Sequence, residues 1–177
     1  MIPRSLLFTL STLFGAAALA AEQVNVNYQY EGSHRADFSS VRGGLQLGGF
    51  SDARGLTDGS LIIDGYRAEA EMADLLRDAF AQGFAHGGAA LGEGESEGEA
   101  DHTVSGSLTS IEAAETADGI QLTIRATLRL NRGARTIWQT NLFGRGTAKD
   151  IATATQAALN RLIRELMNDD YFLMELR

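Results

Sequence analysis

Residues 120–130 read I-Q-L-T-I-R-A-T-L-R-L, and this stretch decides the fold. Apolar side chains occupy every second position, and polar side chains occupy the positions between them. This period of two is typical of a β-strand with one buried and one exposed face. The polar positions include Arg125, Thr127 and Arg129. We expect these three side chains to face outward, and they are the candidate binding residues of the chain.

Turn signals lie on both sides of this strand. Asp118-Gly119 precedes it and residues 131–133, N-R-G, follow it, so the neighbouring stretches should return as hairpins. Residues 103–111 and 136–143 are the expected partner strands. The three strands predict an antiparallel meander with one apolar and one polar face.

A helix is expected on each side of the meander in the sequence. Residues 67–85 and the stretch from Gly146 to Met167 each carry an apolar stripe at helical spacing. Thr147 with Asp150 three residues later resembles a capping box at the start of the second helix. The apolar tail, residues 171–176, is expected to pack back onto the domain.

The N-terminal part predicts further strands. Residues 24–30 alternate strictly and read as a half-buried strand, residues 45–50 suggest a second, and residues 61–63 suggest a short β-arm. Gly48-Gly49 indicates a kink or bulge in the second strand. The complete pattern predicts an α+β fold: a two-layer sandwich in which two helices cover one face of an antiparallel sheet of about 4–5 strands.

The first twenty residues have the features of a secretory signal peptide. Arg4 is followed by an uncharged apolar run, and Ala18-Leu19-Ala20 is a small-residue cleavage site. A membrane anchor would need a longer run with flanking anchors. We therefore expect cleavage after Ala20, with residues 21–177 as a single α+β domain located in the periplasm as a soluble protein, without stable membrane insertion.

Charge and cysteine content limit the possible partners. Without residues 1–20 the chain has 14 Lys and Arg against 23 Asp and Glu, a net charge of −9, so neither nucleic acid nor an anionic membrane is expected as a partner. The chain contains no cysteine, which excludes disulfides, zinc-thiolate sites and a lipidated N-terminal cysteine. Residues 88–101 are rich in Gly and Glu and predict a mobile acidic loop.

Catalytic, cofactor and metal motifs are not recognisable. His34, His86 and His102 lack the close spacing of a metal site and are expected to be solvated or to cap helices. The acidic loop lacks the fixed ligand offsets of a calcium loop, although its binding of a cation stays open. No nucleophile or phosphate-binding motif is present. We therefore expect no enzyme activity, no cofactor and no metal.

Two segments carry a resemblance to a known family. Residues 151–172, I-A-T-A-T-Q-A-A-L-N-R-L-I-R-E-L-M-N-D-D-Y-F, with the preceding strands, and residues 72–87 resemble the YajG family of bacterial envelope lipoproteins. The resemblance covers residues 67–176 and implies a two-layer α+β domain that is not an enzyme. The lipid-bearing cysteine of that family is absent here.

The function expected from these observations is that of a non-enzymatic accessory or scaffold protein of the cell envelope. Its partner would be an envelope or periplasmic protein, bound by the polar sheet face. The alternative is a periplasmic protein that binds a small ligand between the first helix, the acidic loop and the sheet. An enzyme with an unrecognised site is a third possibility.

Overall fold

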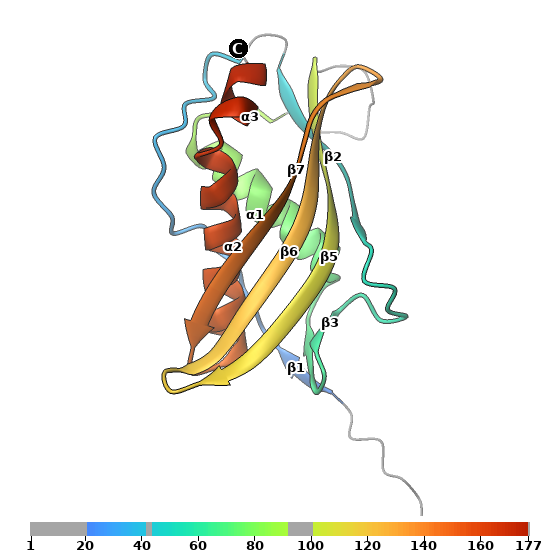
Figure 1. Cartoon of the computed structure of the whole chain (residues 1–177), viewed down its shortest axis with the longest axis vertical. Helices are drawn as coiled ribbons and strands as arrows, with labels where there is room; N and C mark the ends of the chain where they lie inside the picture. The colour runs from blue at the N-terminus through green and yellow to red at the C-terminus, as the bar shows by residue number, and fades with distance from the viewer. Residues whose placement is uncertain (1–20, 42–43, 92–100, 177) are drawn as a thin grey trace, which may run out of the picture.

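The computed structural model describes residues 21–41, 44–91 and 101–176 (Figure 1). The expected signal peptide and the central part of the expected acidic loop, residues 92–100, lie outside these ranges. The elements follow in the order β1 (Glu22–Val24), β2 (Leu45–Asp52), β3 (Leu61–Ile63), β4 (Tyr66–Ala68), α1 (Met72–His86), β5 (His102–Thr116), β6 (Gly119–Arg132), β7 (Arg135–Ala148), α2 (Ile151–Met167) and α3 (Asp170–Glu175).

The main sheet has four strands in the order β2-β5-β6-β7, and the α+β prediction is confirmed. Strands β5, β6 and β7 form the expected antiparallel meander. Strand β2 instead pairs parallel to β5, because the chain passes through β3, β4 and α1 before it returns to the sheet. The register shifts between Leu47 and Phe50, so Gly48-Gly49 is a bulge as expected.

Helices α1 and α2 cover one face of this sheet, and the other face is turned to the viewer in Figure 1. Helix α1 begins at Met72, later than predicted, because Tyr66–Ala68 form β4 of a small second sheet with the order β1-β4-β3. Helix α2 is capped by Asp150, whose carboxylate accepts a hydrogen bond from the Thr153 N–H at 2.8 Å. Thr147 is not the cap, since it lies in β7.

The C-terminal tail packs back onto the sheet, as expected. Residues Asp170–Glu175 form the short helix α3, and the Phe172 side chain is fully buried. Its ring centroid lies 5.0 Å from that of Trp138 in β7. Tyr171 and Met174 on the same helix stay largely exposed.

The strand predicted at residues 24–30 is wrong. Only Glu22–Val24 are a strand, and the chain then runs along α2 without entering a sheet (blue in Figure 1). Val26 and Tyr28 are buried, so the alternation is real, but side chains of the helices satisfy the backbone. The Gln82 side chain of α1 accepts from the Tyr30 N–H at 2.8 Å and donates to the Tyr28 carbonyl at 3.2 Å.

Two glycines bring α2 into direct backbone contact with β7. A Cβ atom added to Gly144 would meet the carbonyl oxygen of Ala158, and one added to Gly146 would meet the carbonyl oxygen of Ala154. Both obstacles are backbone atoms of a helix, so they cannot move aside as a flexible side chain can. The close approach of α2 to the sheet therefore requires glycine, which has no side chain, at both positions.

We expect Gly144→Ala to lower the free energy of unfolding by about 3 kcal/mol, because the new methyl group must push α2 away from the sheet. Gly49→Ala is the matched control, since a Cβ atom there meets nothing within 4 Å. The control should change stability by less than about 0.5 kcal/mol. Urea unfolding of both variants measures the difference, and equal stabilities would contradict the close contact.

Candidate binding surface

The face of the main sheet opposite the helices is mostly polar, and we call it the outer sheet face. The structure places Arg125, Thr127 and Arg129 on it, with both arginines exposed and Thr127 half-buried. Inward neighbours such as Ala126 and Leu128 are buried beneath the helices. The cross-strand neighbours that share this face are Ser105, Ser107, Ser110 and Glu112 of β5 and Gln139, Asn141, Phe143 and Arg145 of β7.

Hydrogen bonds between neighbouring strands hold these side chains in place. Thr127 Oγ1 donates to Asn141 Oδ1 at 2.7 Å, and Arg129 Nε donates to Gln139 Oε1 at 2.9 Å. The Arg125 guanidinium lies 3.5 Å from the Glu112 carboxylate in an exposed ion pair. Such contacts contribute little stability, but they orient side chains on a rigid sheet, which suits a binding surface.

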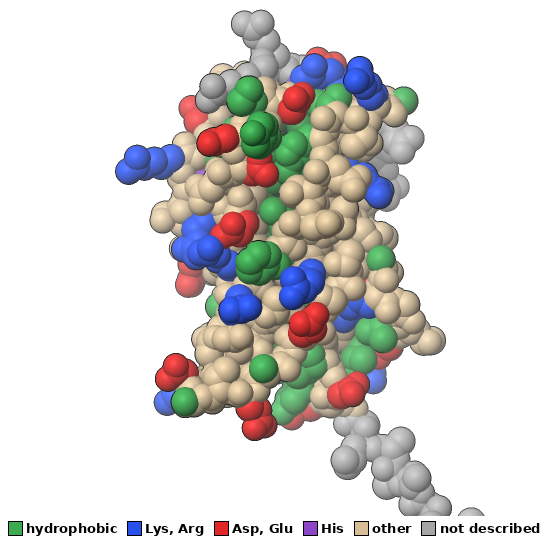
Figure 2. Space-filling model, viewed as in Figure 1, with side chains coloured by type: hydrophobic (Ala, Val, Ile, Leu, Met, Phe, Trp, Pro, Cys, Tyr) green, Lys and Arg blue, Asp and Glu red, His purple; other side chains and the backbone are tan. Residues whose placement is uncertain are grey.

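An exposed aromatic ring interrupts the polar surface. The Phe143 side chain in β7 is 50% exposed, and the Arg125 guanidinium carbon lies 6.0 Å from its ring centroid. Aromatic and arginine side chains contribute most of the binding energy in many protein interfaces. Figure 2 shows this side of the molecule, where small groups of apolar side chains lie among basic, acidic and polar ones. Phe143 was not among the residues singled out by the alternation, which marked β6 alone.

The sheet also carries a charge of opposite sign to that of the whole chain. Residues 119–149, from β6 through β7, contain five Arg and one Lys and no Asp or Glu, whereas the chain has a net charge of −8. This segregation is visible in the sequence but is hidden in the overall composition. It gives these two strands a local positive charge, which favours contact with acidic groups.

The expectation for the histidines is confirmed for His86, which is exposed in the last turn of α1, but not for His102. His102 is buried, and its Nε2 accepts from the Arg132 guanidinium at 2.9 Å, so it is neither solvated nor a cap. His34 and His86, remote in sequence, lie with ring centroids 5.2 Å apart beside Tyr30. Within the described residues, no group of three or more His, Asp or Glu side chains could hold a metal ion.

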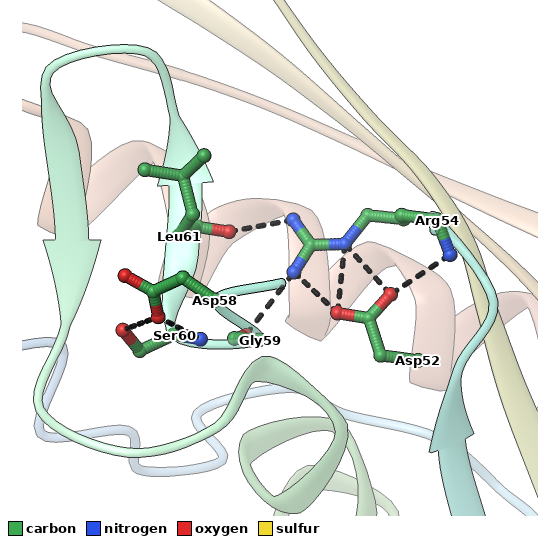
Figure 3. Close-up of polar contacts among 6 residues, drawn as sticks. All are labelled: Asp52, Arg54, Asp58, Gly59, Ser60 and Leu61. Atoms are coloured by element: carbon green, nitrogen blue, oxygen red, sulfur yellow. Dashed lines mark hydrogen bonds and ion pairs between the residues drawn. The ribbon is translucent and has the colours of Figure 1, made fainter. Parts of the chain in front are cut away.

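One polar cluster lies apart from the outer sheet face, at the loop between β2 and β3 (Figure 3). The buried Arg54 side chain pairs with Asp52 through Nε at 2.9 and 3.0 Å and donates to the carbonyl of Leu61 at 2.6 Å and of Gly59 at 3.1 Å. Burial would raise the pKa of Asp52, but the hydrogen bonds and charge of Arg54 lower it below its ordinary value. With its donors engaged by the loop, Arg54 fixes the chain rather than forming a reactive site.

The described surface has grooves in addition to the outer sheet face, and two of them lie beside the main sheet. One, of about 600 Å³, lies between α1 and the β2 bulge and includes Asp74, Arg77 and Thr103. The other, of about 490 Å³, lies between β3 and β5 and is lined in part by Leu56 and Ile111. Neither groove brings together an acid, a base and a nucleophile in the described part of the chain.

Solved structures share this fold at low sequence identity. Protein XCC0632 from Xanthomonas campestris, of the family DUF330, aligns over 88% of this chain and 95% of its own with a TM-score of 0.61 and 16% identity. A PelC variant from Paraburkholderia phytofirmans covers 82% and 96% with a TM-score of 0.52 and 12% identity. Protein CT253 from Chlamydia trachomatis covers 70% and 92% with a TM-score of 0.51 and 11% identity. No curated protein sequence gives a significant match.

The fold defines a class of small α+β proteins in which two helices cover one face of a sheet. Within this class, the model of the LptE family, described as Lipopolysaccharide-assembly, matches residues 57–170. The chain belongs to the LptE family. The expectation of a bacterial envelope protein family is thus confirmed, whereas the more specific resemblance to YajG stays a prediction. In the described residues, no helix has the length and hydrophobicity needed to cross a membrane.

We expect Arg54→Leu to lower the free energy of unfolding by about 2–3 kcal/mol, because Asp52 loses its partner in a mostly buried place and two loop carbonyls lose their donor. Arg67→Leu is the matched control, since Arg67 pairs with Asp58 at 3.3 Å while both side chains are more than 40% exposed. That variant should change stability by less than about 1 kcal/mol. Urea unfolding at pH 7 compares the two.

The same ion pair predicts a dependence of stability on pH. The pKa of Asp52 is lower in the folded protein than in the unfolded chain, so its contribution is present above about pH 4 and is lost as the pH falls through the folded-state pKa. The difference in unfolding free energy between the native protein and Asp52→Asn should therefore shrink as the pH falls below about 4. A constant difference from pH 7 to pH 2.5 would contradict this assignment.

Proposed function

We propose that the protein is a non-enzymatic accessory protein of the cell envelope that takes part in lipopolysaccharide assembly by binding another envelope protein. Membership of a family described by lipopolysaccharide assembly supports the process. The proposal places the mature protein in the periplasm, in agreement with the signal features of residues 1–20. The resemblance to YajG agrees with an envelope role but names no process.

The single observation that carries the binding role is the outer sheet face. It belongs to a basic segment of an acidic protein, and helices α1 and α2 lie on the opposite face of the sheet. Arg125 and Arg129 are exposed on β6, which pairs with β5 on one side and with β7 on the other. Charged residues at such a position raise association rates and select partners by charge.

We expect that deletion of the gene, or its depletion if it is essential, will lower the amount of lipopolysaccharide in the outer membrane. The native gene should restore that amount, and a gene with Arg125→Glu and Arg129→Glu should not, because the reversed charges repel the partner. Quantification of lipopolysaccharide in separated membrane fractions measures the outcome. Thermal unfolding of the purified variant should stay within a few degrees of the native midpoint, since both side chains are exposed.

A variant with Arg35→Glu and Arg164→Glu controls for the change in net charge. Both arginines are exposed, Arg35 in the segment between β1 and β2 and Arg164 in the last part of α2. This control should restore lipopolysaccharide as the native gene does. Full rescue by the Arg125 and Arg129 variant would show that the outer sheet face is not the binding surface, and an unchanged lipopolysaccharide level after deletion would refute the proposed process.

A second candidate function is the binding of a small ligand in the groove between α1 and the β2 bulge. The groove lies close to the place expected from the sequence and carries Asp74, Arg77, Gln46 and Thr103 on its walls. Native mass spectrometry of the protein purified from the periplasm would detect a retained ligand. Loss of that ligand in Arg77→Ala, with the fold intact, would assign it to this groove.

A further inference from the structure

Strand β7 ends the main sheet with a long unpaired edge. It pairs with β6 in unbroken register from Trp138 to Ala148, and no described strand lies on its other side. The unpaired backbone groups along that side form a template for another extended chain. The opposite edge differs, because β2 has eight residues and is bent by the bulge at Gly48-Gly49.

The inward side chains of an added strand would also have a surface of the protein to pack against. Helix α2 lies directly beneath β7, in backbone contact at Gly144 and Gly146. Ala157 of α2 faces Gly146, and Arg161 follows one helical turn later on the same side. A strand placed beside β7 would therefore pack its inward side chains against the flank of α2.

The charges beside this edge select against a second copy of the same chain. Arg135, Arg145 and Lys149 lie on or next to β7, and residues 119–149 contain no acidic side chain to oppose them. Two β7 edges paired with each other would place arginines near arginines, which destabilises a strand pair. An acidic strand would instead form favourable charge pairs with these same basic side chains.

An apolar contact is available in the middle of the edge. Phe143 points from β7 onto the outer sheet face between Arg125 on the neighbouring strand and Arg145 two residues further along. A strand added to β7 would set one of its outward side chains directly beside this ring. A half-exposed aromatic ring flanked by arginines is typical of the centre of a protein–protein interface.

We propose that β7 is the docking edge for an acidic, extended segment of another envelope protein, which adds a fifth strand to the sheet beside Trp138–Ala148. The segment alternates an acidic or apolar outward side chain with an apolar inward one. The proposal rests on the proposed function in that it takes the partner to be an envelope protein, and it specifies the edge and the chemistry by which that partner binds.

A synthetic peptide of alternating Glu and Val, about nine residues long, tests the strand addition on the whole exported protein. Hydrogen exchange of the β7 amides, followed by mass spectrometry, is the readout, because a new ladder protects amides that otherwise face solvent. We expect exchange of residues 138–148 to slow about tenfold with this peptide. The same peptide with Lys in place of Glu should give no protection, and one with a central Pro should lose most of it.

Variants of the protein locate the contact. Phe143→Ser with Arg145→Glu should weaken binding of the acidic peptide at least about tenfold. Leu56→Ser with Arg35→Glu is the matched control, since Leu56 is 46% exposed and Phe143 is 50% exposed while both variants reverse one exposed arginine. The control should bind the acidic peptide as the native protein does, and equal weakening in both variants would overturn the proposal.

Other occupants of the edge give distinct results. Protection of β7 by phosphatidylglycerol vesicles but not by the peptide would overturn the proposal in favour of a lipid surface. Protection that rises with protein concentration alone would overturn it in favour of self-pairing. If the Phe143 and Arg145 variant restores lipopolysaccharide fully in the deletion strain, strand addition at β7 is wrong while the proposed function stands. Loss of peptide binding together with loss of rescue supports both.

Discussion

The backbones of α2 and β7 touch at Gly144 and Gly146, and the rest of the architecture depends on this contact. Because no side chain separates the two elements, α2 lies beneath the edge strand rather than beneath the centre of the sheet. The apolar face of β6 is then closed between α2 and α1, so that Leu128 and its inward neighbours are almost fully buried. Both long helices lie on one face, so neither of them covers the outer sheet face.

Local periodicity predicts a helix or strand correctly where the backbone also forms the hydrogen bonds of that helix or strand. The stripe of α2 and the alternation of β6 are of this kind, and both are confirmed. Residues 24–30 alternate equally well, yet their backbone is satisfied by Gln82 of α1 and Gln156 of α2, which no local pattern reveals. The parallel pairing of β2 likewise depends on a crossover through α1, because strand direction is a property of topology.

The candidate surface was partly predictable for the same reason. Alternation places Arg125, Thr127 and Arg129 on one face, and the structure agrees. The partners of these side chains come from β5 and β7 and depend on the register between strands, so Phe143 could not be recognised from its own surroundings. The charge segregation of residues 119–149 could have been recognised, but the net charge of −8 concealed it. Net charge bears on solubility, whereas the local field decides which partner approaches.

An edge strand as long as β7 is a hazard, because its backbone groups can pair with the edge of another copy of the chain. Glycines prevent a side chain from shielding the edge from below, since Gly144 and Gly146 are needed for the contact with α2. Protection must therefore come from charge, and Arg135, Arg145 and Lys149 supply it by repelling any edge of the same kind. The same positive charges that repel a second β7 edge attract an acidic strand. The basic residues that keep two sheets from pairing through β7 thus also select an acidic strand. Because the glycines needed for the contact with α2 leave the edge without side chains beneath it, specificity at this edge depends on charge.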